Sequence, residues 1–176
     1  MSAYLLLVLA VLSRVIPHPD WLNFTAVGGS LLFFGARRSL RQAVLPVALL
    51  AATDFYLTTY VYRYPFHASD YLLTWAWYAA IVFLGHVLLA KKASALRVTS
   101  AVLIAPTSFF LITNFAAWVA ATTLYPRSLA GLGMSYAAGL PFYRNDLIST
   151  AAVAGLVFGV PALARQLTPH SHPAGA

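Results

Sequence analysis

Asp54 is the residue whose position most strongly suggests chemistry, because it is a carboxylate inside a long apolar run. It lies 13 residues beyond Arg41, or about 20 Å along a helix. An ionised carboxylate alone at that depth in a bilayer costs about 3 kcal/mol or more. Arg14, 13 residues from Met1, is expected at a similar depth unless its side chain extends to the outer headgroups. We predict that Arg14 and Asp54 form an ion pair, which either fixes two helices or takes part in binding a ligand or proton.

Polar and aromatic residues recur at helical spacing in three apolar segments, and a helix would place each set on one face. The three sets are Asp54, Thr58 and Tyr62; Tyr71, Thr74 and Tyr78; and Thr107, Asn114, Trp118 and Tyr125. They gather at one end of their segments, whereas an interfacial aromatic belt appears at both ends. We therefore predict a shared pocket lined by aromatic rings. The alternative is hydrogen bonding between packed helices, worth about 0.6 kcal/mol per contact.

Signatures of catalytic and metal centres are absent from the sequence. It contains no HExxH, no Walker loop, no haem attachment motif and no cysteine, which excludes thiolate chemistry and cysteine ligands. His170 and His172 would bind a metal only weakly. An intramembrane enzyme using Asp54 and His86 is disfavoured, because they belong to different helices at different depths. We expect no enzyme activity, no cofactor and no metal.

Composition identifies the class of protein. Hydrophobic residues make up 61% of the 176 residues and charged residues 9%, which is typical of a membrane protein. The net charge of +7 comes from basic residues that stand in ones to threes between apolar runs. No basic stripe is present, so nucleic acid is not an expected partner and the lipid bilayer is.

Charges and prolines divide the chain into six apolar segments: 3–16, 22–36, 42–62, 70–90, 96–124 and 146–165. None shows strict alternation, so the prediction is an all-α polytopic membrane protein with six transmembrane helices in one bundle over 1–167. Residues 168–176 are expected to form a disordered cytoplasmic tail.

The distribution of basic residues predicts the orientation in a bacterial cytoplasmic membrane. With both termini cytoplasmic, seven lie inside and four outside. The inner ones are Arg37, Arg38, Arg41, Lys91, Lys92, Arg97 and Arg165, and the outer ones are Arg14, Arg63, Arg127 and Arg144.

The last segment is expected to begin after Pro141, with Asn145 or Asp146 as its N-cap. Ala151, Gly155 and Gly159 recur every four residues and form a small-residue face on which another helix can pack closely. On the fourth segment, Trp77 lies about 160° around the helix from Trp75 and is expected to face lipid.

Two stretches, AVLPVALLAATDFYL at 43–57 and LPFYRND at 140–146, precede a small-residue final segment. Together they resemble the substrate-binding S components of energy-coupling factor vitamin transporters. Asn23-Phe24-Thr25 and the YPRSLAGL run at 125–132 are similar to a group of small uncharacterised bacterial membrane proteins near that fold.

The resemblance implies six helices and capture of a small vitamin-like molecule from the outside. It also implies docking to an energy-coupling transmembrane subunit with ATPases. S components usually dock through an Ala-x-x-x-Ala patch on their first helix, which YLLLVLAVLSRV does not contain. A solitary carrier or a different partner therefore stays open.

These observations predict a membrane-embedded protein that binds a small, planar or aromatic molecule for uptake. Aromatic rings would stack on the ligand, and Arg127 and Arg144 would bind an anionic group. The alternative is a structural or assembly subunit of a larger membrane complex, with the small-residue face against a partner. The candidate ligand-binding residues are Asp54, Thr58, Trp75, Tyr78, Asn114, Trp118, Tyr125, Arg127, Arg144, Asn145 and Asp146.

Overall fold

The computed structural model describes residues 1–16, 22–120 and 123–167, and all regular structure within these ranges is helical. The predicted tail at 168–176, with His170 and His172, lies outside the described residues. The α-helices are α1 (Ser2–Val15), α2 (Val27–Arg37), α3 (Val44–Tyr56), α4 (Leu72–Leu89), α5 (Ala95–Ala120), α6 (Leu129–Ala154) and α7 (Val160–Leu167). Four short elements extend them: η1 (Leu40–Ala43), η2 (Leu57–Val61), η3 (Ala68–Tyr71) and η4 (Gly155–Gly159).

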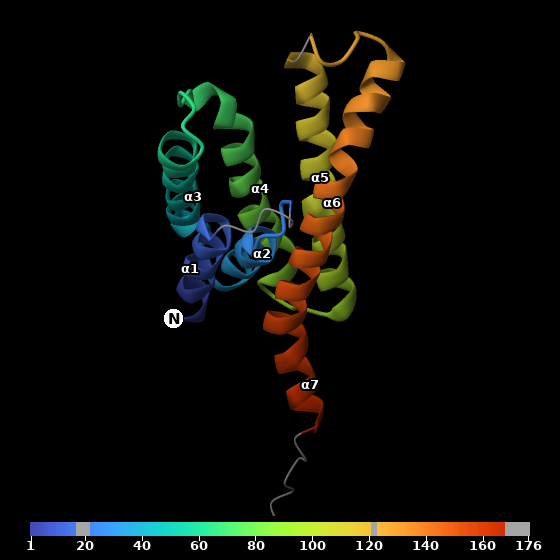
Figure 1. Cartoon of the computed structure of the whole chain (residues 1–176). Helices are drawn as coiled ribbons and strands as arrows, with labels where there is room; N and C mark the ends of the chain where they lie inside the picture. The colour runs from blue at the N-terminus through green and yellow to red at the C-terminus, as the bar shows by residue number, and fades with distance from the viewer. Residues whose placement is uncertain (17–21, 121–122, 168–176) are drawn as a thin grey trace, which may run out of the picture.

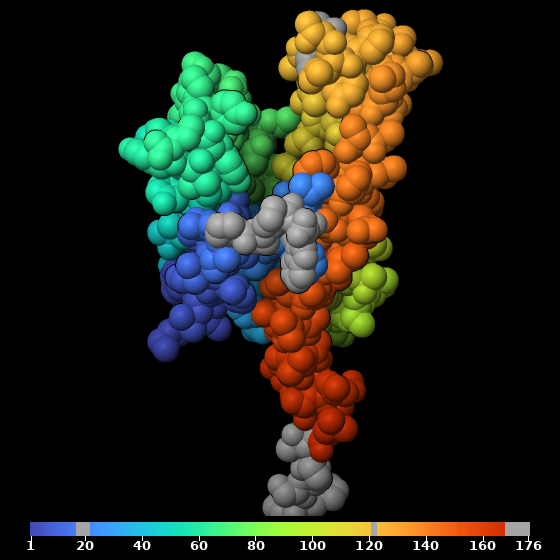
Figure 2. All heavy atoms as spheres, viewed as in Figure 1, coloured from blue at the N-terminus to red at the C-terminus, as the bar shows by residue number. Residues whose placement is uncertain are grey.

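Two helical hairpins, α3–α4 and α5–α6, rise as separate arms from a base that contains α1 and α2 (Figure 1). The arms diverge toward the end that carries the connections after α3 and after α5, which we call the loop end. The N-terminus and α7 lie at the opposite end, which we call the terminal end. The space-filling view shows a hollow between the arms toward the loop end (Figure 2).

Four of the helical stretches are long and apolar enough to cross a membrane: Leu40–Val61, Ala68–Leu89, Ala95–Ala120 and Leu129–Leu167. They indicate a multi-pass membrane protein. α1 is apolar but only 14 residues long, and α2 has 11 residues. At 1.5 Å per residue α2 extends only about 17 Å, much less than the bilayer core. The prediction of an all-helical membrane protein is therefore confirmed at this coarser level.

The predicted start of the last helix is wrong. A continuous helix runs from Leu129 to Leu167, and Pro141, Asn145 and Asp146 all lie inside α6. Its N-cap is Ser128, whose side chain accepts a hydrogen bond from the Gly131 amide. A proline within a helix removes one backbone hydrogen bond and need not end the helix, least of all in an apolar segment where neighbouring helices compensate.

The centre of the molecule forms around α2, which is buried from Val27 to Ala36. Glycines permit its close contact with α4: a Cβ built on Gly35 would lie 2.0 Å from the Val82 carbonyl oxygen, and one on Gly85 would lie 2.3 Å from the Leu32 carbonyl oxygen. α2 therefore packs backbone to backbone against α4, as small residues allow in membrane helices.

The predicted small-residue face is not used inside this chain. Ala151, Gly155 and Gly159 are exposed, and a Cβ built on either glycine would meet nothing within 4 Å. The opposite face of the same helix packs instead, through Ala154 and Phe158, which are buried in the core. Phe158 contributes far more apolar area than any residue of the small-residue face, which favours turning its face inward.

Candidate functional site

A cavity of about 210 Å³ lies where six helices converge, and we call it the central cavity. Each of α1 to α6, and the segment before α2, supplies or adjoins lining residues. A pocket at a junction of helices with several polar groups is the usual form of a ligand site. Its lining residues are Arg14, Asn23, Thr25, Val27, Gly28, Asp54, Tyr71, Thr74, Trp77, Tyr78, Phe109 and Asp146.

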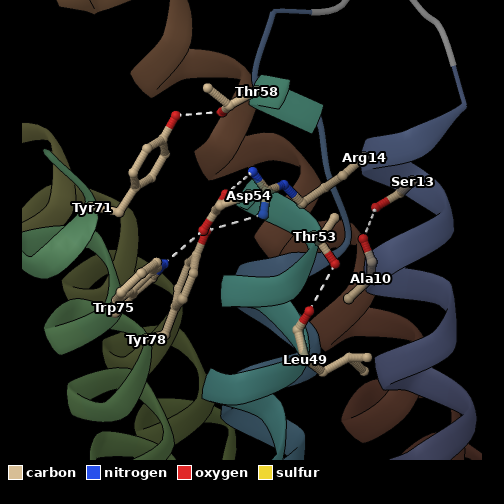
Figure 3. Close-up of polar contacts among 10 residues, drawn as sticks. All are labelled: Ala10, Ser13, Arg14, Leu49, Thr53, Asp54, Thr58, Tyr71, Trp75 and Tyr78. Atoms are coloured by element: carbon tan, nitrogen blue, oxygen red, sulfur yellow. Dashed lines mark hydrogen bonds and ion pairs between the residues drawn. The ribbon is translucent and has the colours of Figure 1, made fainter. Parts of the chain in front are cut away.

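Asp54 on α3 is held by partners from two other helices (Figure 3). Its Oδ1 lies 2.5 Å from Nη2 of Arg14, as the sequence predicts, and its Oδ2 accepts a hydrogen bond of 2.9 Å from Nε1 of Trp75. Arg14 also donates to the Tyr78 hydroxyl at 3.3 Å. The carboxylate is 3% exposed and the guanidinium side chain 18%. Each oxygen of Asp54 is thus satisfied in place, as a buried ion pair requires.

An aromatic stack covers this ion pair from the loop end. The rings of Phe66 and Tyr71 are stacked with their centroids 5.2 Å apart, and those of Tyr71 and Trp75 are stacked at 6.0 Å. The Tyr71 hydroxyl shares a hydrogen bond of 2.5 Å with the buried Thr58. Trp75 and Thr58, both predicted to bind ligand, therefore position Asp54 and Tyr71 respectively.

Asp146 on α6 lines the same cavity but has fewer partners than Asp54. It is 6% exposed, and its side chain has one described partner, the Thr150 hydroxyl, which donates at 3.4 Å. It also borders a smaller void of about 40 Å³ toward the α5–α6 hairpin. No described arginine, lysine or histidine forms a salt bridge with it. Asp146 is thus a buried carboxylate with unused hydrogen-bonding capacity.

Aromatic rings also line the cavity. Trp77 is 7% exposed, donates a hydrogen bond of 3.1 Å to Ser108 and packs on Phe109 with centroids 4.6 Å apart. The prediction that Trp77 faces lipid is therefore wrong. α4 contacts α3 on one face and α5 on another, so both Trp75 and Trp77 find protein partners.

Four predicted residues lie outside the central cavity along the α5–α6 arm. Asn114 and Tyr125 border an open groove of about 350 Å³ between α5 and α6, which we call the α5–α6 groove. Trp118 donates to the Pro126 carbonyl at 2.9 Å, and Arg127 lies over its ring at 5.6 Å. Arg127 also donates to the Trp118 and Val119 carbonyls at the end of α5, so it caps that helix. The predicted stripe on α5 is thus divided between the groove and a helix cap.

The two remaining predicted residues directly precede Asp146 in α6 but do not line the central cavity. Arg144 is exposed and is not among the cavity-lining residues. Asn145 donates a hydrogen bond of 2.8 Å to the Leu22 carbonyl, which joins α6 to the segment before α2. The candidate ligand-binding residues therefore do not all surround one pocket: of them, Asp54, Tyr78 and Asp146 line the central cavity, together with Arg14 and with Tyr71 and Thr74 of the predicted polar-aromatic face on α4.

The segment before α2 supplies cavity residues that sequence reasoning did not select. Asn23 has φ 59°, a left-handed conformation that asparagine tolerates better than most residues, and Thr25 follows it. The available signal was the polar sequence Asn-Phe-Thr directly before an apolar segment. Trp77 and Phe109 gave no such signal, because aromatic residues are common on lipid-facing surfaces as well.

A model of a protein family described as a family of unknown function, DUF6580, matches residues 1–171. The chain belongs to this family. No curated protein and no solved structure matches it. The match covers every element that contributes to the central cavity, so the cavity lies within the family's own domain.

Proposed function

We propose that this member of the DUF6580 family is a membrane protein that binds a small molecule in the central cavity, captures it from the outer side and serves its uptake. The observation that supports the proposal is a cavity with two carboxylates, an arginine and four aromatic rings at the centre of an apolar helical bundle. Polar and ionisable residues inside membrane proteins are expensive to bury and mark ligand or ion sites by default.

The size of the cavity limits the ligand. Its 210 Å³ corresponds to about seven water-sized volumes of 30 Å³ each. Pockets for drug-sized molecules run from about 300 to 1,000 Å³. The central cavity therefore fits a small ligand, or one polar end of a longer molecule whose remainder lies in the adjoining α5–α6 groove. Asn23 and Phe109 border both spaces and join them.

The orientation belongs to the same proposal. Six membrane crossings with both termini cytoplasmic place the terminal end inside and the hollow between the arms outside. The seven inner basic residues named from the sequence belong to elements at the terminal end or to their connections. A reporter fused after Leu167 is expected to be cytoplasmic, and one inserted at His67 is expected to face outward. A reporter after Leu167 that faces outward would overturn the proposed direction of capture.

Native mass spectrometry of the purified protein tests binding. Thr74 lines the cavity, so Thr74→Phe fills it, while Thr99→Phe places the same ring on an exposed part of α5 as a matched control. We expect one small molecule bound to the wild type and to Thr99→Phe, and none bound to Thr74→Phe. Absence of any small molecule from all three proteins would contradict the proposal.

A second candidate function, a structural subunit of a larger complex, is favoured by one observation. Ala151, Gly155 and Gly159 form an exposed small-residue face with open space beside both glycines. Such faces allow close contact with another membrane helix, including that of a coupling subunit. A stoichiometric protein partner in the same spectra, lost in Gly155→Leu and found without any small molecule, would favour this function instead.

A further inference from the structure

The charges around the central cavity do not cancel. Arg14 and Asp54 form a pair with no net charge, and each is fixed by a further hydrogen bond, to Tyr78 and from Trp75 respectively. Asp146 is the third ionisable side chain among the lining residues other than tyrosine, and it is an acid. The described lining therefore carries one uncompensated negative charge when Asp146 is ionised.

The surroundings of Asp146 leave room for a donor. A carboxylate offers about four lone-pair sites, and here only the Thr150 hydroxyl at 3.4 Å uses one. The side chain is more than nine-tenths buried, so the remaining sites are open only to what the cavity holds. It borders the central cavity directly, which places any occupant within its reach.

The aromatic rings that line the cavity also favour a positively charged occupant. Tyr71, Trp77, Tyr78 and Phe109 contribute aromatic faces or edges to the lining. A cation over an aromatic face is attracted by the ring quadrupole, most strongly for tryptophan and most strongly where water is excluded. An anion in the same place would meet the negative faces of these rings and the charge of Asp146.

The arginines that the sequence suggested for an anionic ligand are not at the cavity. Arg127 binds the carbonyls at the end of α5, and Arg144 is exposed on α6. Among the described lining residues, Arg14 is the one cation, and it is already paired with Asp54.

We infer that the occupant of the central cavity is a small organic cation, with an ammonium group bound to Asp146 and an apolar part packed among the aromatic rings. This inference rests on the proposed function and specifies the chemical class of its ligand.

A size-matched set of probes tests the sign of the charge. Benzylammonium, benzyl alcohol and benzoate share one ring and differ in the charge of one substituent. Binding to the purified full-length protein is measured by isothermal titration. We expect benzylammonium to bind at least tenfold more tightly than benzyl alcohol, and benzoate to bind more weakly than both.

Variants then assign the preference to one side chain. Asp146→Asn keeps the shape and an acceptor for Thr150, and we expect it to remove the tenfold preference for benzylammonium. Asp146→Glu should restore part of it. Asp70→Asn, which removes an exposed carboxylate in η3, should keep the full preference and serves as the matched control.

The outcomes separate this inference from the proposed function. Equal binding of the three probes, tighter binding of benzoate, no binding of any probe, or an undiminished preference in Asp146→Asn would each overturn the cationic ligand. If native mass spectrometry still finds a small molecule displaced by Thr74→Phe, the proposed function survives that result. Loss of the bound molecule from Asp146→Asn with retention in Asp70→Asn supports both.

Discussion

The two buried carboxylates among the described residues line one cavity and are held in different ways. Asp54 has a guanidinium on one oxygen and an indole N–H on the other, from helices α1 and α4. Asp146 has one long hydrogen bond from a threonine one turn further along its own helix. Both oxygens of Asp54 therefore already have partners, whereas Asp146 still has hydrogen-bonding capacity for an occupant of the cavity.

This difference, and not burial, distinguishes a structural acid from the acid that we propose binds ligand, since both are almost fully enclosed. A buried ion pair with satisfied oxygens joins helices that are distant in sequence. A buried acid with free lone pairs lowers the stability of the empty protein. Such a costly group is retained where it has a function, such as binding. Four predictions test the distinction, beginning with the largest expected effect and ending with the smallest.

The first prediction concerns the Asp54 side. Asp54→Leu leaves the Arg14 guanidinium buried without its acid and should lower the free energy of unfolding by about 3 to 5 kcal/mol. Arg14→Leu should do the same. The double variant Arg14→Leu/Asp54→Leu should recover much of the loss, because neither charge is then unpaired. Unfolding in detergent, followed by circular dichroism, measures all three.

Additive losses in the double variant would show that the two side chains do not stabilise the fold through each other. The control is Asp70→Leu, which removes an exposed carboxylate of η3 and should change stability by less than about 0.5 kcal/mol.

The second prediction compares two tryptophans and concerns affinity. Trp77→Leu keeps an apolar side chain but removes the ring beside the cavity, and should weaken binding of the co-purified ligand by about 1 to 2 kcal/mol. Trp118→Leu removes a ring that lies against Pro126 and Arg127 at the end of α5, and should leave affinity unchanged. Isothermal titration decides, and equal losses at both positions would mean that ligand binds along the whole α5–α6 arm.

The third prediction concerns the packing behind Asp146. A Cβ built on Gly28 of α2 would lie 2.3 Å from the Thr150 hydroxyl, the partner of Asp146. Gly28→Ala should therefore displace Thr150 and lower stability by about 1 to 3 kcal/mol. Gly155→Ala meets open space and should change stability by at most about 1 kcal/mol, in the stabilising direction expected of alanine in a helix. A stable Gly28→Ala protein with unchanged ligand affinity would show that Thr150 does not position Asp146.

The sequence was sufficient to predict features that depend on depth along a single helix. Arg14 lies 13 residues from Met1 and Asp54 lies 13 residues from Arg41, so their similar heights in the membrane follow from helix geometry, and their opposite charges make them partners. The helical class likewise follows from composition and from the absence of alternating patterns.

Which face of a helix turns toward a neighbouring helix was not predictable in the same way. α4 carries few polar residues, so its pattern does not indicate that Trp77 faces α5 while Trp75 faces α3. The exposed stripe at Gly155 was misassigned for a similar reason: small residues permit close packing but do not require it. Pro141 was misread because tertiary packing maintains a helix through a residue that often ends one.

The last prediction is the smallest in energy and separates the two carboxylates most directly. Asp146→Asn removes a charge that has no described cationic partner and keeps an acceptor for Thr150. The free energy of unfolding should therefore stay within about 1 kcal/mol of the wild type, or rise, because an uncompensated buried charge is lost. Asp54→Asn, the same change on the other side, should lose about 3 to 5 kcal/mol because Arg14 stays charged. The two variants are compared in parallel melts of ligand-free protein. A loss at Asp146→Asn as large as that at Asp54→Asn would show that Asp146 also stabilises the empty fold, and the contrast between a structural acid and a binding acid would not hold.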